Sequence, residues 1–350
     1  MFISPCYIYK VNKIYGTWFQ GDDTIKTKQI IILALIIVAA SGCVSTEPVN
    51  EDYIESDLQP DIPDSTINDP SNGSQPSLPN INQSILTVHF IDVGQGDSIL
   101  IQINDKNMLI DAGDNRAGNT VVSYLKDNGV TELDVVVATH AHADHIGGMV
   151  TVLNNFKVNR FIDSGNPHTT KTYENMLIVI DEKDIPFSLA EAGQAIDLDT
   201  STTITVLNPG KLTGDLNDDS VILKLTYEDV SFLFTGDAET HAENKMIAYD
   251  ISSDILKVAH HGSRSSTSSD FLKKVNPDIC IIMVGVDNRY GHPHQEIIDR
   301  LNLFGCEVYR TDLDGNIIIK TDGREYSIET QTSGLVFPLT TMTFALMAEA

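Results

Sequence analysis

The sequence has few cysteines and few basic residues. Four cysteines, at positions 6, 43, 280 and 306, are too few for a disulfide scaffold, and no two of them form a Cys-x-x-Cys pair. Whether Cys280 and Cys306 form a disulfide bond stays open. The chain carries 23 Lys and Arg against 49 Asp and Glu, and its net charge is -26. This balance argues against an extensive nucleic-acid-binding surface, although a nucleic-acid substrate could still be held locally by metal ions.

No long apolar run marks a membrane-spanning helix near the N-terminus. The run Ile30–Ala40 is shorter than the roughly 17–25 residues that a span needs, and it is typical of the apolar region of a signal peptide. Ala40-Ser-Gly-Cys43 follows and resembles a lipoprotein signal, apart from Ala in place of Leu three positions before the cysteine. We therefore expect residues 1–43 to be a signal or lipoprotein anchor region with the lipid on Cys43; the alternative is a simple membrane anchor with an incidental cysteine. Either an exported, lipid-anchored location on the extracytoplasmic face of the membrane or a secreted one follows.

Basic residues are absent from positions 44–84, where eight acidic residues stand among Pro, Ser and Asn. Such a stretch cannot bury enough apolar area to offset the entropy of ordering, so we expect a disordered acidic linker. The folded domain is predicted to cover residues 85–330. The apolar tail 331–350 fits no periodic element and stays unassigned.

Apolar runs and amphipathic patterns alternate through the predicted domain, which indicates one α/β (α+β) domain with two sheets covered by helices. The predicted strands are 86–91, 99–103, 108–110, 133–138, 160–162, 203–207, 221–227, 231–234, 255–258, 279–284, 307–310 and 317–320. The predicted helices are 120–128, 148–154, 173–183, 239–249, 269–275 and 295–304.

The strongest chemical signal is Thr139-His-Ala-His-Ala-Asp-His-Ile-Gly-Gly148, which lies between a buried strand and a helix. Three imidazoles and a carboxylate within six positions would repel one another or stay unpaired unless a cation organised them. Neutral His and ionised Asp are ligands of borderline divalent metals, and no thiolate competes with them. The segment therefore predicts a metal site.

This block resembles the His-x-His-x-Asp-His signature of metallo-β-lactamase-fold hydrolases. Further motifs match in order: Leu109-Ile-Asp-Ala-Gly113, Phe234-Thr-Gly-Asp237 and Lys257-Val-Ala-His-His-Gly-Ser263. Phe90-Ile-Asp-Val-Gly-Gln-Gly-Asp-Ser98 and Asn288-Arg-Tyr-Gly-His-Pro293 are similar to the ComEC-type branch, over about residues 86–321. The resemblance implies a four-layer αββα sandwich. The multi-spanning channel part of that branch is absent, so a role in DNA import is not implied.

The resemblance also implies a set of metal ligands. His140, His142 and Asp237 would hold a first metal, and Asp144, His145, Asp237 and His261 a second one. His260 is the alternative to His261, which is favoured because it directly precedes the glycine of the motif. The cofactor would be one or two divalent ions per chain, zinc or manganese.

One departure concerns the first metal, to which many members of the fold supply a further histidine. Only His168 is available in the corresponding region, and we expect it at the rim of the site. Asn217-Asp-Asp-Ser220 resembles the Asn-Asp-x-Ser segment of the ComEC-type branch, so water or that segment is expected to complete the first metal. Supporting or substrate-proximal positions are Gln95, Asp97, Asp111, Asn217, Ser220 and His260.

These features predict an extracytoplasmic hydrolase of phosphodiesters, with DNA or RNA included, that acts through metal-activated water. Asp144 would both bind metal and orient the water, and His292 would contact the phosphate or the leaving group. Alternatives are hydrolysis of a small phosphoester, a phosphocholine-type headgroup or another ester or lactam, and a non-catalytic metal-binding surface module. The sequence predicts no protein partner.

Overall fold

The computed structural model describes residues 84–331 and 337–338. The predicted signal region with Cys43, most of the linker and most of the tail lie outside the described residues. Only Ser84 of the linker, and Gln331 and the short strand at 337–338 of the tail, are described. The predictions for these segments stay predictions. In the described part, no helix has both the length and the apolar character needed to cross a membrane.

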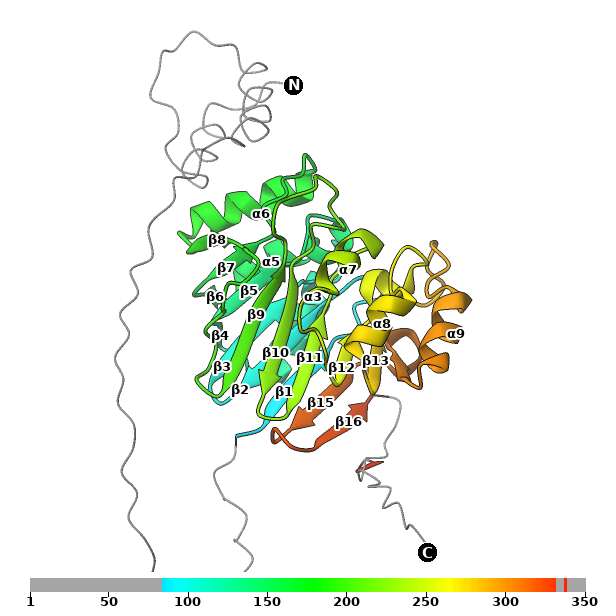
Figure 1. The fold of residues 1–350 in the computed structure, drawn as a ribbon. Coiled ribbons are helices and arrows are strands. Elements are labelled where there is room, and N and C mark those ends of the chain that lie inside the picture. The colour runs from blue at the N-terminus through cyan, green and yellow to red at the C-terminus, as the bar shows by residue number, and fades with distance from the viewer. Residues whose placement is uncertain (1–83, 332–336, 339–350) are drawn as a thin grey trace, which may run out of the picture. The chain divides into compact units, whose positions relative to one another are not determined.

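Two mixed sheets form the centre of the domain (Figure 1). The first has the order β17-β16-β15-β1-β2-β3-β5-β7-β8, and the second has the order β14-β13-β12-β11-β10-β9. The strands of the first sheet are β1 Leu86–Phe90, β2 Ile99–Ile103, β3 Lys106–Ile110, β5 Val135–Ala138, β7 Phe161–Asp163, β8 Phe187–Leu189, β15 Ile317–Thr321, β16 Tyr326–Thr330 and β17 Phe337–Pro338. Those of the second are β9 Thr202–Asn208, β10 Ile222–Tyr227, β11 Val230–Phe234, β12 Ile255–Lys257, β13 Ile279–Ile282 and β14 Glu307–Arg310.

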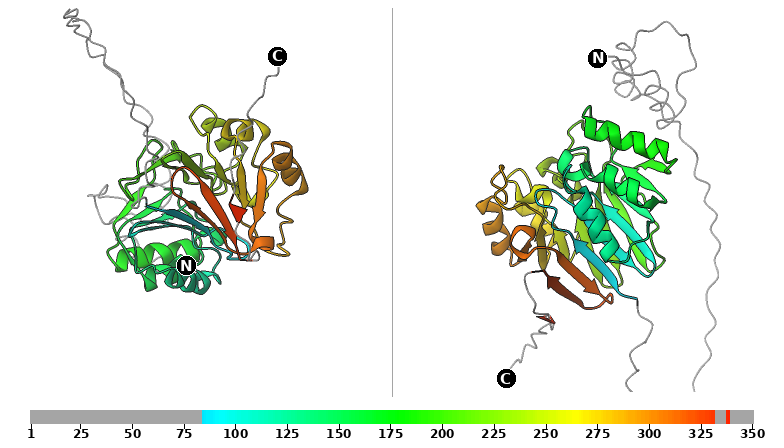
Figure 2. Two further views of the ribbon diagram at one scale, coloured as in Figure 1. Left: turned by 90° about the horizontal axis from the view of Figure 1, so that it is seen from below. Right: turned by 180° about the vertical axis from the view of Figure 1, so that it is seen from behind.

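Helices cover the outer face of each sheet, as the two views of Figure 2 show. Helices α3, α5 and α6 lie outside the first sheet, and α7, α8 and α9 lie outside the second. The helices are α3 Gly118–Asp127, α4 Ala143–Ile146, α5 Met149–Asn155, α6 Lys171–Glu182, α7 Thr240–Met246, α8 Ser269–Val275, α9 Gln295–Leu303 and α10 Thr311–Asp314, with a 3-10 turn η1 at Ala259–Gly262. This arrangement confirms the predicted αββα sandwich.

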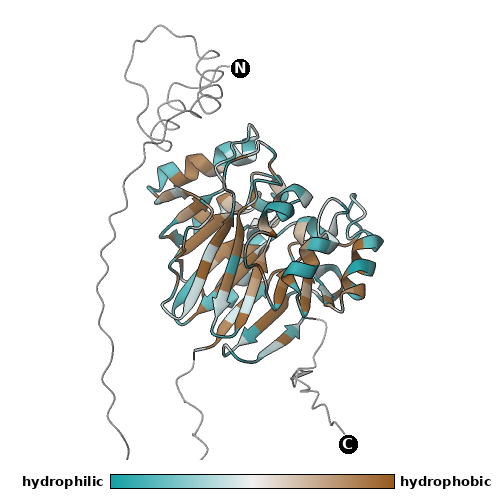
Figure 3. Ribbon diagram, in the orientation of Figure 1, coloured by the Kyte–Doolittle hydropathy of each residue, from teal (hydrophilic) through white to brown (hydrophobic). Residues whose placement is uncertain are grey.

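Alternation along the strands explains the layers. Ile99, Ile101 and Val137 point into the core between the two sheets, where they meet residues such as Leu223 and Phe232. Because successive side chains of a strand point to opposite faces, the intervening residues are available to the outer helices. Leu256 and Cys280 accordingly pack with helices α7–α9 in a second core. Central strands such as β5 and β13 are buried along their whole length, whereas β9 and β16 alternate apolar with polar residues; Figure 3 shows the mixed hydropathy of the outer strands and helices.

Two details differ from the sequence-based expectation. The strand predicted at 133–138 is interrupted at Asp134, because Glu132–Leu133 (β4) pairs with Lys157–Val158 (β6) in a separate two-stranded sheet. Asp134 accepts hydrogen bonds from the Asn107 backbone N–H at 3.0 Å and from Lys106 Nζ at 2.8 Å, so it ties the break to β3. Strands β6, β8, β16 and β17 and the short helices α4 and α10 were not predicted.

A buried disulfide bond joins Cys280 in β13 to Cys306, the residue before β14. It connects the edge strand of the second sheet to its neighbour and answers the question that the sequence left open.

Candidate metal centre

The predicted metal ligands follow the carboxyl ends of neighbouring strands. The motif that contains His140 and His145 follows β5, and Asp111 follows β3, which runs parallel to β5. Asp237 follows β11, and His261 lies in η1 after β12, which runs parallel to β11. Since parallel strands present their carboxyl ends at one edge, both sheets deliver ligands to the same place.

The first donor set consists of His140, His142 and Asp237. His140 is buried, and its Nε2 lies 2.9 Å from His142 Nδ1 and 3.8 Å from Asp237 Oδ2. Ser220 holds two members together, because its Oγ lies 3.4 Å from His140 Nδ1 and accepts a hydrogen bond from the Asp237 backbone N–H at 3.2 Å. The predicted supporting role of Ser220 thus has a physical basis: it fixes the relative position of two donors.

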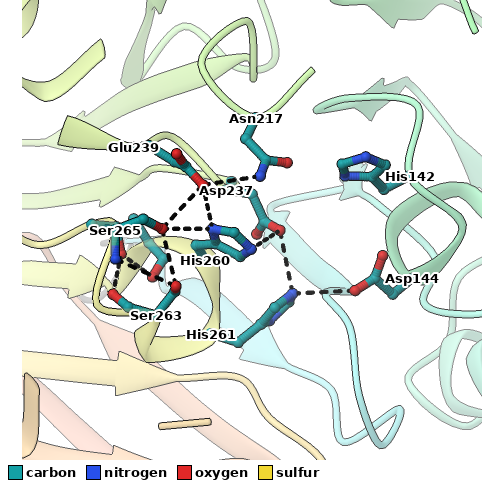
Figure 4. Close-up of polar contacts among 12 residues, drawn as sticks. His142, Asp144, Asn217, Asp237, Glu239, His260, His261, Ser263 and Ser265 are labelled. Carbon is teal, nitrogen blue, oxygen red and sulfur yellow. Dashed lines mark hydrogen bonds and ion pairs between the residues drawn. The ribbon is translucent and has the colours of Figure 1, made fainter. Parts of the chain in front are cut away.

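The second donor set consists of Asp144, His145, Asp237 and His261. Asp237 Oδ1 lies 3.2 Å from His145 Nε2, and Asp237 Oδ2 lies 3.5 Å from His261 Nε2. Asp144 Oδ2 is also 3.5 Å from His261 Nε2 (Figure 4). Asp237 Oδ1 thus faces His145, while Oδ2 faces His261 of this set and His140 of the first set, so Asp237 lies between the two sets.

Donor atoms without partners show that these residues suit a divalent cation. His145 Nε2, His261 Nε2 and Asp237 Oδ1 are buried and have no hydrogen bond of acceptable geometry. Two ligands bound tetrahedrally to one zinc ion at 2.0–2.2 Å lie about 3.4 Å apart. Most of the separations above fall within a few tenths of an ångström of that value. Leaving such atoms unsatisfied is costly, and a bound cation would satisfy them together.

The far nitrogens of the imidazoles are held by the protein. Asp111, in a left-handed conformation with φ of 58°, lies 2.8 Å from His145 Nδ1 through Oδ2. It also accepts hydrogen bonds from the Thr139 N–H at 2.8 Å and the Thr139 hydroxyl at 2.6 Å. His261 Nδ1 donates to the Met283 carbonyl at 2.8 Å. Both imidazoles thus direct Nε2 toward the centre, which is how metal-binding histidines are oriented.

Asp97 lies on the Nδ1 side of two metal-ligand histidines. It lies 3.4 Å from His261 Nδ1 and 3.9 Å from His145 Nδ1. Asp97, Asp111 and His145 could form a third metal-binding group by proximity alone. However, Asp97 is already neutralised by Lys257, whose Nζ lies 2.5 Å from Asp97 Oδ2, and the Nδ1 of His145 already faces Asp111. We therefore assign Asp97 and Asp111 to orientation of the histidines.

The carboxylates of the centre shift the pKa values of its histidines. Burial opposes protonation of His145, yet the Asp237 and Asp111 carboxylates raise its pKa well above the ordinary value. The pKa of His261 is raised in the same way, against burial, by Asp237 and Asp144. Burial and the neighbouring His145 hold the pKa of His140 well below its usual range. The carboxylates thus favour positive charge at His145 and His261.

The other predicted residues lie at the rim. The half-buried His292 has its ring centroid 6.4 Å from that of His261, and its Nδ1 has no partner. Burial, together with His261 and His260, lowers the pKa of His292 to about 4. Gln95 accepts a hydrogen bond from the Gly285 N–H at 3.3 Å, and His168 stands beside His142 with ring centroids 6.2 Å apart. The rim position expected for His168 stays a prediction.

Two residues of the centre were not predicted to have a role. Lys257 is fully buried, and its Nζ also donates to the Gly236 carbonyl at 2.9 Å. Glu239 accepts hydrogen bonds through Oε1 from Asn217 Nδ2 at 3.2 Å and from the Ser265 hydroxyl at 3.0 Å (Figure 4). The only sequence signal was a lysine at the end of an apolar strand and an acid two residues after Asp237.

Known proteins with similar sequences include ComE operon protein 3 of Bacillus subtilis (strain 168), which is 29% identical over 251 residues. The alignment covers 66% of this chain and 32% of that protein. Competence protein ComA of Neisseria gonorrhoeae is 28% identical over 243 residues, which cover 67% of this chain and 32% of that protein. The chain thus spans about a third of the length of these curated relatives.

Among solved structures, the metallo-beta-lactamase fold protein YhfI of Bacillus subtilis aligns with a TM-score of 0.47 and 15% identity, over 68% of this chain and all of that one. The model of the metallo-beta-lactamase superfamily matches residues 91–286, more than half of the chain. The chain therefore belongs to the metallo-beta-lactamase superfamily, and its curated relatives place it in the ComEC-type branch of that superfamily.

Proposed function

We propose that this metal-dependent-hydrolase-like protein hydrolyses phosphodiesters, DNA or RNA among them. The observation that carries the proposal is that Asp237 contacts members of both donor sets: it lies 3.8 Å from His140 of the first set and 3.2 Å from His145 of the second. This arrangement suits two divalent ions side by side, which is a common solution for stabilising both the attacking and the leaving oxygen in phosphoryl transfer.

Asp144 and His292 have different roles in the proposed hydrolysis. Bound divalent ions would supply Lewis acidity and a water that ionises near neutral pH. Asp144 is the more exposed of the two carboxylates among the predicted metal ligands, with a side chain 26% exposed against 3% for Asp237. It can therefore orient an attacking water as well as bind metal. His292, neutral at pH 7, has its ring 6.4 Å from that of His261 and can accept a proton or donate a hydrogen bond to substrate.

A cationic rim near Asp144 favours an anionic substrate. Arg289 is exposed, and its guanidinium lies 4.9 Å from the centre of the Tyr290 ring and donates to the Tyr290 hydroxyl at 2.7 Å. The Tyr290 ring stacks on His292 with centroids 5.6 Å apart. Guanidinium groups match phosphate geometry well. The name of the relative from Neisseria gonorrhoeae refers to competence, and that of a third relative, from Haemophilus influenzae, refers to recombination, a process that acts on DNA.

We also propose that the protein is exported and anchored by a lipid on Cys43. The buried Cys280–Cys306 disulfide supports this location, because disulfide bonds persist mainly in oxidising compartments. Replacing Cys43 by Ser in the full chain should move the protein from the membrane fraction to the soluble fraction, while Cys6→Ser should not. Equal membrane association of both variants would contradict lipidation at Cys43.

The activity is tested with the full chain, loaded with Zn²⁺ or Mn²⁺ in turn. Bis-p-nitrophenyl phosphate and single-stranded DNA are the substrates, and the double variant Asp144→Ala/His145→Ala is the control. Hydrolysis by the wild type that the double variant lacks supports the proposal; equal activity of the two overturns it.

Two further substrates separate the alternatives. Hydrolysis of p-nitrophenyl phosphorylcholine but not of the diester would favour a headgroup hydrolase, and turnover of nitrocefin would favour a lactamase. Tight zinc binding with no turnover of any substrate would favour a non-catalytic metal-binding module.

A further inference from the structure

The first donor set has three protein donors, His140, His142 and Asp237, and it shares Asp237 with the second set. Zinc in proteins is usually four-coordinate, and its fourth position is filled by a further protein donor or by water. Three nearby side chains could supply another donor: His168, Asn217 and His260. Their contacts distinguish them.

His260 faces the carboxylate oxygen that His140 also faces and that His261 approaches to 3.5 Å. The His260 Nε2 atom lies 3.7 Å from Asp237 Oδ2, and His140 Nε2 lies 3.8 Å from it. Both separations are close to the 3.4 Å or so expected between two ligands of one tetrahedral ion. His260 thus approaches Asp237 much as an accepted donor does, and Figure 4 shows its ring directed at Asp237.

The opposite nitrogen of His260 is anchored as in a metal-bound histidine. Its Nδ1 lies 3.1 Å from Glu239 Oε1 and 3.3 Å from the Ser265 hydroxyl. Glu239 is itself fixed by hydrogen bonds from Asn217 and Ser265. A carboxylate that accepts the Nδ1 proton makes Nε2 the free, more basic ligand atom. Asn217 thereby acts by holding Glu239.

The backbone at this position is strained in a way that serves two imidazoles. His260 and His261 are both left-handed, with φ of 49° and 54°. For residues other than glycine this conformation costs about 1–2 kcal/mol each. It places both Nε2 atoms within 3.7 Å of Asp237 Oδ2, although neighbouring residues normally diverge. Strain of this kind persists where function needs it.

The other two candidates fit less well. His168 Nδ1 lies 3.2 Å from the Thr170 hydroxyl, and its ring contacts His142 rather than Asp237. The Asn217 Oδ1 atom is buried and without a partner, but an amide oxygen is a weaker ligand for zinc than an imidazole.

We propose that His260 is the third nitrogen ligand of the first donor set, oriented by Glu239. The two adjacent histidines of the motif then serve different ions, His260 the first and His261 the second. This role of His260 is in metal binding and does not depend on whether the substrate is a phosphodiester.

The experiment is zinc titration of the full chain after removal of metal by chelation, with stoichiometry checked by elemental analysis. His260→Ala should lose the same site that His140→Ala loses, with a fall in affinity of tenfold or more, and should keep the second site. His241→Ala, which removes an exposed histidine from α7, is the control and should bind zinc as the wild type does. Glu239→Gln should weaken the first site by about 10–100-fold, the range for loss of an orienting carboxylate.

Cobalt substitution provides a second readout. The visible spectrum of Co²⁺ at the first site should change in His260→Ala and in His260→Gln, and not in His241→Ala. Circular dichroism establishes that each variant is folded. Wild-type zinc affinity and cobalt spectrum in folded His260→Ala or His260→Gln would overturn the inference, as would a wild-type chain that binds no metal at the first donor set.

Discussion

Lys257 Nζ lies 2.5 Å from Asp97 Oδ2, and both side chains are fully buried beneath the metal centre. Lys257 also donates to the Gly236 carbonyl, next to Asp237, while Asp97 lies 3.4 Å from His261 Nδ1. Burial opposes ionisation of Asp97, but Lys257 keeps its pKa below the ordinary value. This ion pair therefore connects the glycine-rich turn after β1 with both loops that deliver ligands from the second sheet.

Replacing Lys257 by Met should lower the free energy of unfolding by about 3–5 kcal/mol, because it leaves a buried carboxylate unpaired. Urea unfolding with and without zinc measures the effect. The double variant Asp97→Asn/Lys257→Met removes both charges and should recover part of the loss. A loss of less than 1 kcal/mol in the single variant would show that water reaches Asp97.

Gly96→Ala should disturb the centre through the backbone. A Cβ at Gly96 would lie 2.1 Å from the Asp144 carbonyl oxygen, and φ there is +132°. Gly94 is the matched control, since its φ is +73° and a Cβ would meet nothing within 4 Å. We expect Gly94→Ala to cost about 1–2 kcal/mol of stability. Gly96→Ala should cost about 1–3 kcal/mol more and also weaken zinc binding. Equal zinc affinity in both variants would contradict this.

Arg289→Ala should raise KM for bis-p-nitrophenyl phosphate about tenfold with little change in kcat, because an exposed guanidinium binds ground state and transition state alike. Arg324→Ala, an exposed arginine in the turn between β15 and β16, is the control. Steady-state kinetics at low salt provide the measurement. The same KM in both variants would remove Arg289 from the substrate-binding rim.

His89 should make stability depend on pH away from the metals. Burial lowers its pKa to about 4, and its ring nitrogens lie 3.0 Å from the Tyr124 hydroxyl and 3.1 Å from Gln102 Oε1. Between pH 6.5 and 4 the unfolded chain binds a proton that the folded chain does not. Stability therefore falls as the pH drops through this window, by about 3 kcal/mol for this group.

Comparison with His89→Gln isolates that contribution. The buried Asp163, whose pKa burial raises to about 6, acts with the opposite sign in an overlapping range, and it is common to both proteins. On going from pH 7 to pH 4.5, the free energy of unfolding should change toward lower stability in the wild type relative to His89→Gln, by about 3 kcal/mol. Parallel pH curves would contradict the assignment.

Local sequence patterns were enough to predict much of the fold. Strands such as Ile99–Ile103 and Glu307–Arg310 and the helix Ser269–Val275 have the predicted bounds, because each is a single apolar run or amphipathic period between turn residues. Asp134 shows the limit. It interrupts a continuous apolar run for a reason that is tertiary, namely its hydrogen bonds to β3.

The candidate site follows the same division. The donors His140 to His145 are predictable because their spacing in one loop makes chemical sense by itself. The role of Lys257 depends on Asp97, 160 positions earlier, and that of Glu239 on His260, so neither could be read from local spacing. Local spacing also could not predict that both His260 and His261 approach Asp237, because this depends on the left-handed backbone of the two residues.

The position of Asp237 has a thermodynamic consequence. Because one carboxylate lies between both donor sets, the two ions cannot bind independently: loading either set changes the charge and orientation that the other encounters. By linkage, the factor by which the first ion alters affinity for the second equals the factor by which the second alters affinity for the first. Zinc titrations of this protein should therefore be analysed as a cooperative pair, with Asp237→Asn as the variant in which the coupling free energy decreases.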